Sequence, residues 1–266
     1  MSHWELTTMG GKNPVHTGSF LNGYEQGDFS AEEVLVRESI QNSMDAGKSI
    51  KKLTTEIEFH EIEFKGNGKE RLLESLEFKT MISPRLASFN HNNSAKNFSE
   101  QANKFLNEKS IFALLIRDKN TTGLSGAWDK YEKGDHFARL VCALNLDDKA
   151  DEDSNSGGSY GLGKTTYAVN SYINTVLYHS VFQPDSRSLN VGRRLMVSGI
   201  FPRHDFEGSK YSGYGFFGEK ESQDSDSARP FQDEVAKSLW EDVCESMVGK
   251  NSDSLKRSDG DYGTDV

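Results

Sequence analysis

The segment Leu35–Gly47 combines, on one predicted helix, side chains that could hold a metal ion and accept a proton. Ser30 is placed to cap this helix, Glu33 completes a capping box, and Gly47 is a typical stop. At about 100° per residue, two carboxylates and two amides fall on one stripe that contains no lysine or arginine. These residues are Glu38, Gln41, Asn42 and Asp45. Such oxygen ligands suit Mg²⁺, and a carboxylate near the ion can take a proton from water.

The other side of this helix predicts how it packs. An apolar stripe is expected to face the core, and it consists of Val36, Ile40, Ser43 and Met44. The polar stripe has two interpretations, a solvated acidic face or a site for a divalent cation. This helix alone leaves both interpretations open.

The spacing of the polar residues resembles a known motif. Glu38, Asn42, Asp45 and Ala46 match the E-x-x-x-N-x-x-D-A box of the GHKL ATPases, a superfamily that contains gyrase B, Hsp90 chaperones, histidine kinases, MutL and MORC proteins. The resemblance implies that Glu38 is the general base and reaches the metal through water. It also implies that Asn42 holds Mg²⁺, and that Asp45 and Ala46 belong to the nucleotide pocket.

A second motif follows the strand predicted at Ser110–Arg117, which is apolar on both faces as central strands are. Asp118 opens a polar turn that resembles the D-x-G-x-G motif, and the resemblance implies that it accepts a hydrogen bond from the adenine amino group. Asn120, Gly123 and Leu124 would line the same pocket. Asn120 stands where the motif has its first glycine, and it can keep the turn because asparagine tolerates left-handed backbone angles.

A glycine-rich stretch after an acidic loop resembles the third motif, G-x-x-G-x-G-K, and implies an ATP lid at about residues 147–165. Backbone amides there, and the N-terminus of a helix expected to start near Thr165, would cradle the phosphates. Lys164 would neutralise phosphate charge. The ATP-binding residues implied here are Gly157, Gly158, Tyr160, Gly161, Leu162, Gly163, Lys164 and Thr165.

Two alternatives compete with an ATPase of this superfamily. Gly158, Gly163, Lys164 and Thr165 also fit the Walker A pattern of a P-loop NTPase. A P-loop needs a buried strand before its first glycine, and the preceding residues DDKADEDSNSG are polar. The other alternative is a nucleotide-gated binding module with negligible turnover.

The resemblance also implies a fold, an α/β (α+β) two-layer sandwich of the GHKL or Bergerat type with a mixed, mainly antiparallel sheet backed by helices. Residues 1–29 are predicted to form an arm or strap, and residues 30–266 the ATPase domain with an insertion at about 66–109. Gly263-Thr264 resembles the dipeptide that opens a late strand and supplies Thr264 to the adenine pocket. The chain is therefore expected to be a fragment of a longer protein.

Other segments predict further elements. Leu53–Lys65 alternates as a strand or hairpin, with a change of phase at His60 that suggests a bulge or turn. Two apolar strands are expected at Ile173–Phe182 and Arg194–Phe201, and a helix at Phe231–Val248.

Composition narrows the class of protein. The 31 basic and 41 acidic residues give a net charge of −10, which does not indicate a general nucleic-acid-binding surface. No apolar run predicts a membrane span, and the N-terminus lacks a signal pattern. Cys142 and Cys244 are expected to be reduced thiols, with no disulfide framework or zinc site. A cytoplasmic protein is predicted.

Together the motifs predict Mg²⁺-dependent ATP binding and hydrolysis that drives a conformational or dimerisation switch in a larger protein. They look most similar to those of MORC/Hsp90-like bacterial ATPases, and this similarity suggests a role in anti-phage defence. By analogy, the N-terminal arm would support a homodimer, while no effector is indicated. Turnover by this chain alone is expected to be low, because a second domain often supplies a phosphate-contacting lysine in this superfamily.

Overall fold

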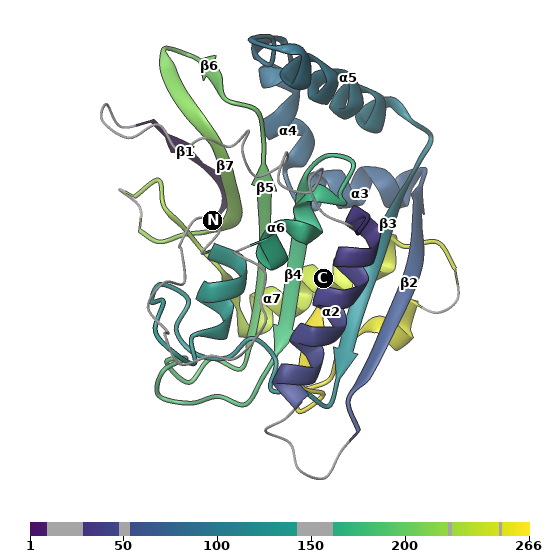
Figure 1. The fold of residues 1–266 in the computed structure, drawn as a ribbon, viewed down its shortest axis with the longest axis vertical. Coiled ribbons are helices and arrows are strands. Elements are labelled where there is room, and N and C mark those ends of the chain that lie inside the picture. The colour runs from purple at the N-terminus through teal and green to yellow at the C-terminus, as the bar shows by residue number, and fades with distance from the viewer. Residues whose placement is uncertain (10–28, 48–53, 143–161, 223–224, 250–251) are drawn as a thin grey trace.

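The computed structural model describes residues 1–9, 29–47, 54–142, 162–222, 225–249 and 252–266, with the side chains of residues 162–164 outside this description (Figure 1). The strands are β1 (Ser2–Thr8), β2 (Glu56–Lys65), β3 (Ser110–Lys119), β4 (Thr175–Val181), β5 (Arg193–Ile200), β6 (His204–Phe206), β7 (Ser209–Lys220), β8 (Ala228–Arg229), β9 (Phe231–Gln232) and β10 (Gly263–Asp265). The α-helices are α2 (Ala31–Gly47), α3 (Asn67–Ser75), α4 (Phe78–Ile82), α5 (Asn93–Asn107), α6 (Leu162–Val169) and α7 (Asp233–Ser246). Short 3-10 helices cover Ser83–Ser88 and Ser252–Leu255, and a π-helical turn covers Ala138–Cys142.

One sheet organises this part of the chain, in the order β1-β7-β5-β4-β10-β3-β2, with β6 and β8 beside β7 and β9 beside β5. Every described strand pair is antiparallel. A mainly antiparallel sheet with helices is therefore confirmed. The strand predicted at Ser110–Arg117 is present as β3, although it lies next to the edge strand β2 rather than in the centre.

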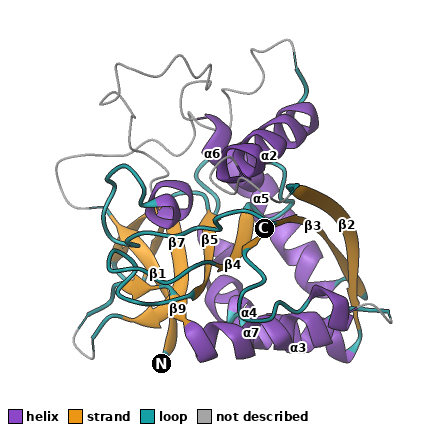
Figure 2. Ribbon diagram, turned by 90° about the horizontal axis from the view of Figure 1, so that it is seen from below, coloured by secondary structure: helices purple, strands orange, loops and turns teal. Residues whose placement is uncertain are grey.

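Helices cover both faces of the sheet (Figure 2). On one face α2 and α6 pack over β3, β4 and β5, and on the other face α7 packs beside α3. Every residue of β5 is buried, so this strand needs cover on both sides. The described fold therefore has three layers, with helices on each side of the sheet, one more than the predicted two-layer sandwich. No helix in the described ranges is long and apolar enough to cross a membrane.

Helix α2 starts as predicted. Ser30 and Glu33 form the capping box, with the Ser30 N–H donating to Glu33 Oε2 at 2.8 Å and the Glu33 N–H donating to Ser30 Oγ at 3.2 Å. Its packing differs from the prediction, because the buried residues are Leu35, Ser39 and Ser43. Of the stripe expected to face the core, only Ser43 is buried, while its three apolar members are exposed, at 44% for Val36, 38% for Ile40 and 53% for Met44. The helix faces a polar site in the sheet, which small hydroxyl side chains suit better than large apolar ones.

Strand β2 runs without interruption and pairs with β3 from Glu56 to Lys65. The predicted bulge or turn at His60 is therefore wrong. The change of phase has another cause, since Phe59 pairs with Ile116 on the α2 face while Phe64 packs on the α7 face. An edge strand that is partly apolar on both faces does not show a single alternating pattern.

The segment 66–109, predicted as an insertion, folds into α3, α4 and α5. These helices pack through Phe78 and Phe98 against Trp4 of β1 and Phe201, which directly follows β5. Residues 2–8, predicted to belong to an arm, form the strand β1 and pair with β7. The rest of that predicted arm, residues 10–28, lies outside the described residues.

A buried ionic cluster lies under α7 and is centred on Asp265 of β10. Arg257 Nε donates to the Asp265 carboxylate at 2.7 Å, and His179 Nδ1 lies 2.8 Å from the same oxygen. The His179 ring stacks on Trp240 of α7 with 4.7 Å between centroids. Burial lowers the pKa of His179 to about 4. Burial also opposes the charged form of Asp265, but Arg257 outweighs this effect and lowers the pKa of Asp265 to about 2. The carboxylate is therefore charged and the imidazole neutral at pH 7.

This neutral imidazole predicts a pH-dependent loss of stability. An unfolded chain binds a proton on His179 near the ordinary pKa of 6.5, whereas the folded protein does so only near pH 4. Its contribution is thus fully present above pH 6.5 and is lost as the pH falls toward 4. Urea unfolding across this window should show a decline of up to about 3 kcal/mol that His179→Asn removes. His91→Gln, in an exposed loop, should keep the wild-type slope. Equal slopes for wild type and His179→Asn would contradict the buried neutral state.

Candidate functional site

Asp118, next to the C-terminal end of β3, is the centre of a polar site on the α2 face. Its Oδ1 accepts the backbone N–H of Thr264 at 2.8 Å and the hydroxyl of Thr121 at 2.7 Å. Its Oδ2 accepts the Ser43 hydroxyl at a longer 3.3 Å. Burial raises the pKa of Asp118, against the opposing effect of the Thr121 and Thr264 hydrogen bonds. Oδ2 retains acceptor capacity, since an ionised carboxylate oxygen can accept more than one hydrogen bond.

The turn after β3 has the predicted backbone conformation. Asn120 and Gly123 have φ values of +60° and +61°, both in the left-handed region. Gly123 is further required by space, because a Cβ added there would lie 2.5 Å from the carbonyl oxygen of Val181. The expectation that Asn120 tolerates a left-handed backbone angle in this turn is confirmed.

Two residues that the sequence did not indicate connect this turn to β10. Ser180 Oγ accepts the Leu124 N–H at 2.8 Å and lies 3.4 Å from the Thr264 hydroxyl. Arg257 Nη2 donates to the carbonyl of Thr264 at 3.0 Å and to the carbonyl of Asp118. Ser180 belongs to an apolar strand and Arg257 to a polar stretch, so neither stands in a motif that could have identified it.

A cavity of about 50 Å³ lies between α2 and these strands. Its lining residues are Ser39, Asn42, Ser43, Ala46, Ile116, Asp118, Gly123, Leu124, Leu140, Tyr167, Thr264 and Val266. Residues predicted from separate motifs, far apart in the chain, therefore meet at one place. The volume suits a few water molecules, so these residues form one part of any larger ligand site.

The residues of the first motif differ in their position relative to this cavity, since Asn42 and Ala46 line it whereas Glu38 and Asp45 do not. Asn42 Nδ2 donates to the Tyr167 hydroxyl at 3.4 Å. Glu38 is 15% exposed at its side chain, and its carboxylate lies 3.2 Å from Nη2 of the more exposed Arg37. Asp45, predicted to belong to the pocket, is exposed, accepts a hydrogen bond from Gln41 at 2.9 Å and does not line the cavity.

The glycine-rich motif lies largely beyond the described residues. Residues 157–161 are outside them, while Leu162, Gly163 and Lys164 begin α6 without described side chains. This helix starts a few residues earlier than predicted, and Thr165 is buried within it. The predicted phosphate contacts therefore stay predictions.

The strand pairing bears on the Walker A alternative. A P-loop belongs to a parallel β-α-β unit, whereas every strand pair in the described ranges is antiparallel. The described sheet therefore does not favour a P-loop protein.

The described side chains contain no group of three or more histidine, cysteine, aspartate or glutamate residues that could hold a metal ion. Both cysteines, Cys142 and Cys244, are free thiols.

Comparison of the chain with protein-family models, with curated proteins and with solved structures found no match in any of the three. The likeness to the GHKL ATPases therefore depends on the sequence motifs alone. Of the residues that they implied, Asn42, Ala46, Asp118, Gly123, Leu124 and Thr264 line one cavity.

The turn after β3 gives a test of this geometry. Gly123→Ala should lower the free energy of unfolding by roughly 2–5 kcal/mol, because the new Cβ meets both a left-handed backbone and the Val181 carbonyl. Gly208→Ala is the matched control, since φ there is +80° and nothing lies within 4 Å of the added atom. It should cost only the backbone strain, about 1–2 kcal/mol. Equal losses in urea unfolding would argue against the close approach at Gly123.

Proposed function

We propose that the chain binds ATP with Mg²⁺ and hydrolyses it, and that Asp118 recognises the adenine. The observation that carries this proposal is the meeting of Asn42, Asp118, Gly123 and Thr264 at one cavity. The amino group of adenine is a hydrogen-bond donor, and Asp118 Oδ2 is a buried carboxylate oxygen with acceptor capacity left. The Thr264 hydroxyl, at the same cavity, is a second polar contact for the base.

Asn42 suits a role at Mg²⁺. Its amide nitrogen bonds Tyr167, which leaves the amide oxygen available as a ligand. One protein oxygen is enough in such a site, because Mg²⁺ usually keeps several waters and takes further oxygens from substrate phosphates. The bound ion would neutralise charge on the phosphates, and the proposed role of Lys164 and the glycine-rich backbone amides is the same.

Glu38 is the proposed general base. It lies one helical turn before Asn42, so its carboxylate can reach a water near the same phosphate. Its partner Arg37 is an exposed residue, and ion pairs at the protein surface typically contribute less than about 1 kcal/mol. Glu38 can therefore leave Arg37 and turn toward the water.

The same contact favours a second candidate function. While Arg37 holds the Glu38 carboxylate, the site would bind nucleotide without turnover and act as a nucleotide-gated module. In either case the nucleotide would drive a conformational or dimerisation switch in a larger protein, and anti-phage defence is the biological setting that we propose for it.

Base selectivity tests the role of Asp118. ITP has a carbonyl where adenine has its amino group, so wild type should prefer ATP over ITP by roughly 10- to 100-fold, equivalent to about 1–3 kcal/mol. Asp118→Asn should lose this preference, because its amide can donate to the inosine carbonyl. The variant can still accept the Thr264 N–H and should fold. Asp205→Asn, at an exposed position in β6, is the control. An ATP preference that survives Asp118→Asn in calorimetry would refute adenine recognition there.

Two substitutions on α2 separate catalysis from binding. Glu38→Gln removes the base but no metal ligand, so phosphate release should fall about 10²- to 10⁴-fold while ATP affinity holds. Asn42→Ala removes the proposed metal ligand and should weaken Mg²⁺-dependent ATP affinity itself. Gln41→Ala, on the exposed side of the helix, should change neither. If Glu38→Gln loses ATP affinity while Asn42→Ala keeps it, the roles of general base and metal ligand proposed for these two residues are wrong. ATP binding with no Glu38-dependent phosphate release would identify the binding module.

A further inference from the structure

Tyr167 of α6 lines the cavity beside Asp118, although it belongs to none of the sequence motifs. The residue is 8% exposed. Its hydroxyl accepts a hydrogen bond from Asn42 Nδ2 at 3.4 Å and also hydrogen-bonds to the Ser39 side chain. Burial raises the pKa of Tyr167, and the charges of Asp118 and Glu38 add to this effect. Tyr167 therefore lies close to the residues proposed to bind adenine, hold the metal and act as the base.

The hydrogen atoms around this hydroxyl can be placed by elimination. Ser39 Oγ lies 2.7 Å from the carbonyl oxygen of Leu35, and a carbonyl cannot donate, so the Ser39 hydrogen points to Leu35. Ser39 can then only accept from Tyr167, which commits the Tyr167 hydrogen to Ser39. Because the pKa of Tyr167 is raised, the hydroxyl keeps this hydrogen at neutral pH.

The same elimination fixes the orientation of the Asn42 amide. The Tyr167 oxygen has only lone pairs left for Asn42, so the amide atom that faces it must be the nitrogen. The amide oxygen is on the other arm of the group and is turned away from Tyr167. Asn42 is an exposed residue, so a cation can approach this oxygen.

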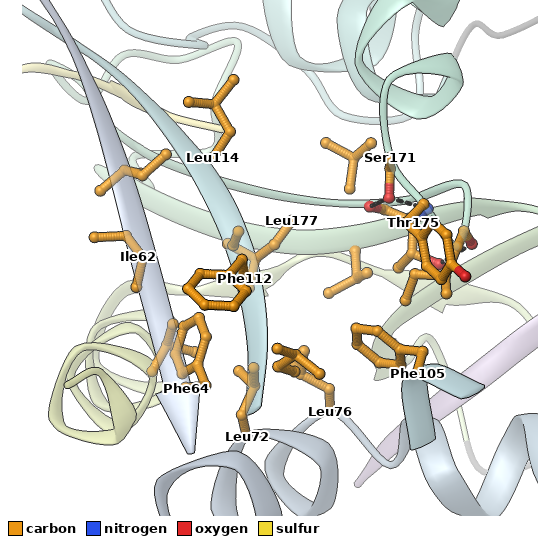
Figure 3. Close-up of a pocket in the computed structure, with 18 of the residues that line it drawn as sticks. Ile62, Phe64, Leu72, Leu76, Phe105, Phe112, Leu114, Ser171, Thr175 and Leu177 are labelled. Atoms are coloured by element: carbon orange, nitrogen blue, oxygen red, sulfur yellow. Dashed lines mark hydrogen bonds between the residues drawn. The ribbon is translucent and has the colours of Figure 1, made fainter. Parts of the chain in front are cut away.

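Contacts on both sides of α6 hold Tyr167 in place. Its ring meets the ring of Tyr178 in β4 edge-on, with 6.2 Å between centroids. One turn later, Asn170 Nδ2 donates to the carbonyl of the first residue of α2 at 3.1 Å. Beyond α6, the Ser171 hydroxyl accepts the Thr175 N–H at 3.1 Å and donates to the Thr175 carbonyl at 2.8 Å, as the dashed lines in Figure 3 show. The Tyr167 hydroxyl is therefore a rigid acceptor for Asn42.

We propose that Tyr167 is a positioning residue for the metal ion, whose hydroxyl holds the Asn42 amide nitrogen so that the amide oxygen is presented to Mg²⁺. The inference rests on the proposed function, since it takes Asn42 as the metal ligand. An amide nitrogen does not ligate Mg²⁺, which takes oxygen ligands in near-ideal octahedral geometry. Hydrogen-bonding partners that orient a ligand in this way are common around metal sites.

Nuclear magnetic resonance of the chain without nucleotide tests the orientation itself. Wild type should show a nuclear Overhauser contact between the Nδ2 hydrogens of Asn42 and the ring hydrogens of Tyr167. Tyr167→Phe should weaken this contact, because the ring stays in place while the acceptor is gone. No contact in wild type would overturn the proposed orientation, whatever the chain binds.

Calorimetry of ATP binding, with Mg²⁺ and with EDTA, tests the role at the metal. Tyr167→Phe should weaken Mg²⁺-dependent ATP affinity about 3- to 10-fold, the value of one neutral hydrogen bond, while metal-free affinity and the preference over ITP stay unchanged. In an Asn42→Asp background the same substitution should cause no further loss, because a carboxylate presents an oxygen on either side. Tyr172→Phe, at a half-exposed position outside this cavity, is the matched control and should behave as wild type.

Two calorimetric results would overturn the role of Tyr167. One is an unchanged Mg²⁺-dependent affinity in Tyr167→Phe. The other is an equal loss in the Asn42→Asp background, which would indicate a merely structural effect. Wild type that shows the magnetic resonance contact but binds no ATP would instead refute the proposed function, and the role at the metal with it.

Discussion

A hydrogen bond between a buried carboxylate and a backbone amide ties β10 to β3, beside the ladder that pairs β10 with β4. Asp118 Oδ1 accepts the Thr264 N–H at 2.8 Å, and this joins the end of β3 to the last described strand. Arg257 strengthens the junction by donating to the carbonyls of both residues. A buried carboxylate must be matched by donors, so Thr121 and Ser43 complete the set. Thr264 and Val266 line the polar cavity because β10 is held in this place.

The sequence indicated the parts of the site that belong to local patterns. Asp118 lies near the end of an apolar strand, Asn120 adopts the left-handed conformation that the turn requires, and Thr264 lies in a late strand. The contributions of Ser180 and Arg257 could not be predicted, because they arise from contacts between segments far apart in the chain. No local pattern contains such contacts.

The packing of α2 was mispredicted for a physical reason. Helical periodicity predicts that the most apolar stripe faces the core. This helix instead covers a polar site, in which a serine hydroxyl donates to the Asp118 carboxylate. Ser39 and Ser43 therefore face the sheet while Ile40 stays exposed. The second layer of helices could not be predicted either. An apolar run indicates that a strand is buried, but it does not indicate what covers each face of the sheet.

A crystal structure of the chain with Mg²⁺ and a non-hydrolysable ATP analogue would show whether Asp118 recognises adenine. We expect the adenine amino group within hydrogen-bonding distance of Asp118 Oδ2, the Thr264 hydroxyl near the base, and the Asn42 amide oxygen bound to Mg²⁺. A nucleotide bound with its base elsewhere, or held only through its phosphates in the manner of a P-loop, would contradict this expectation.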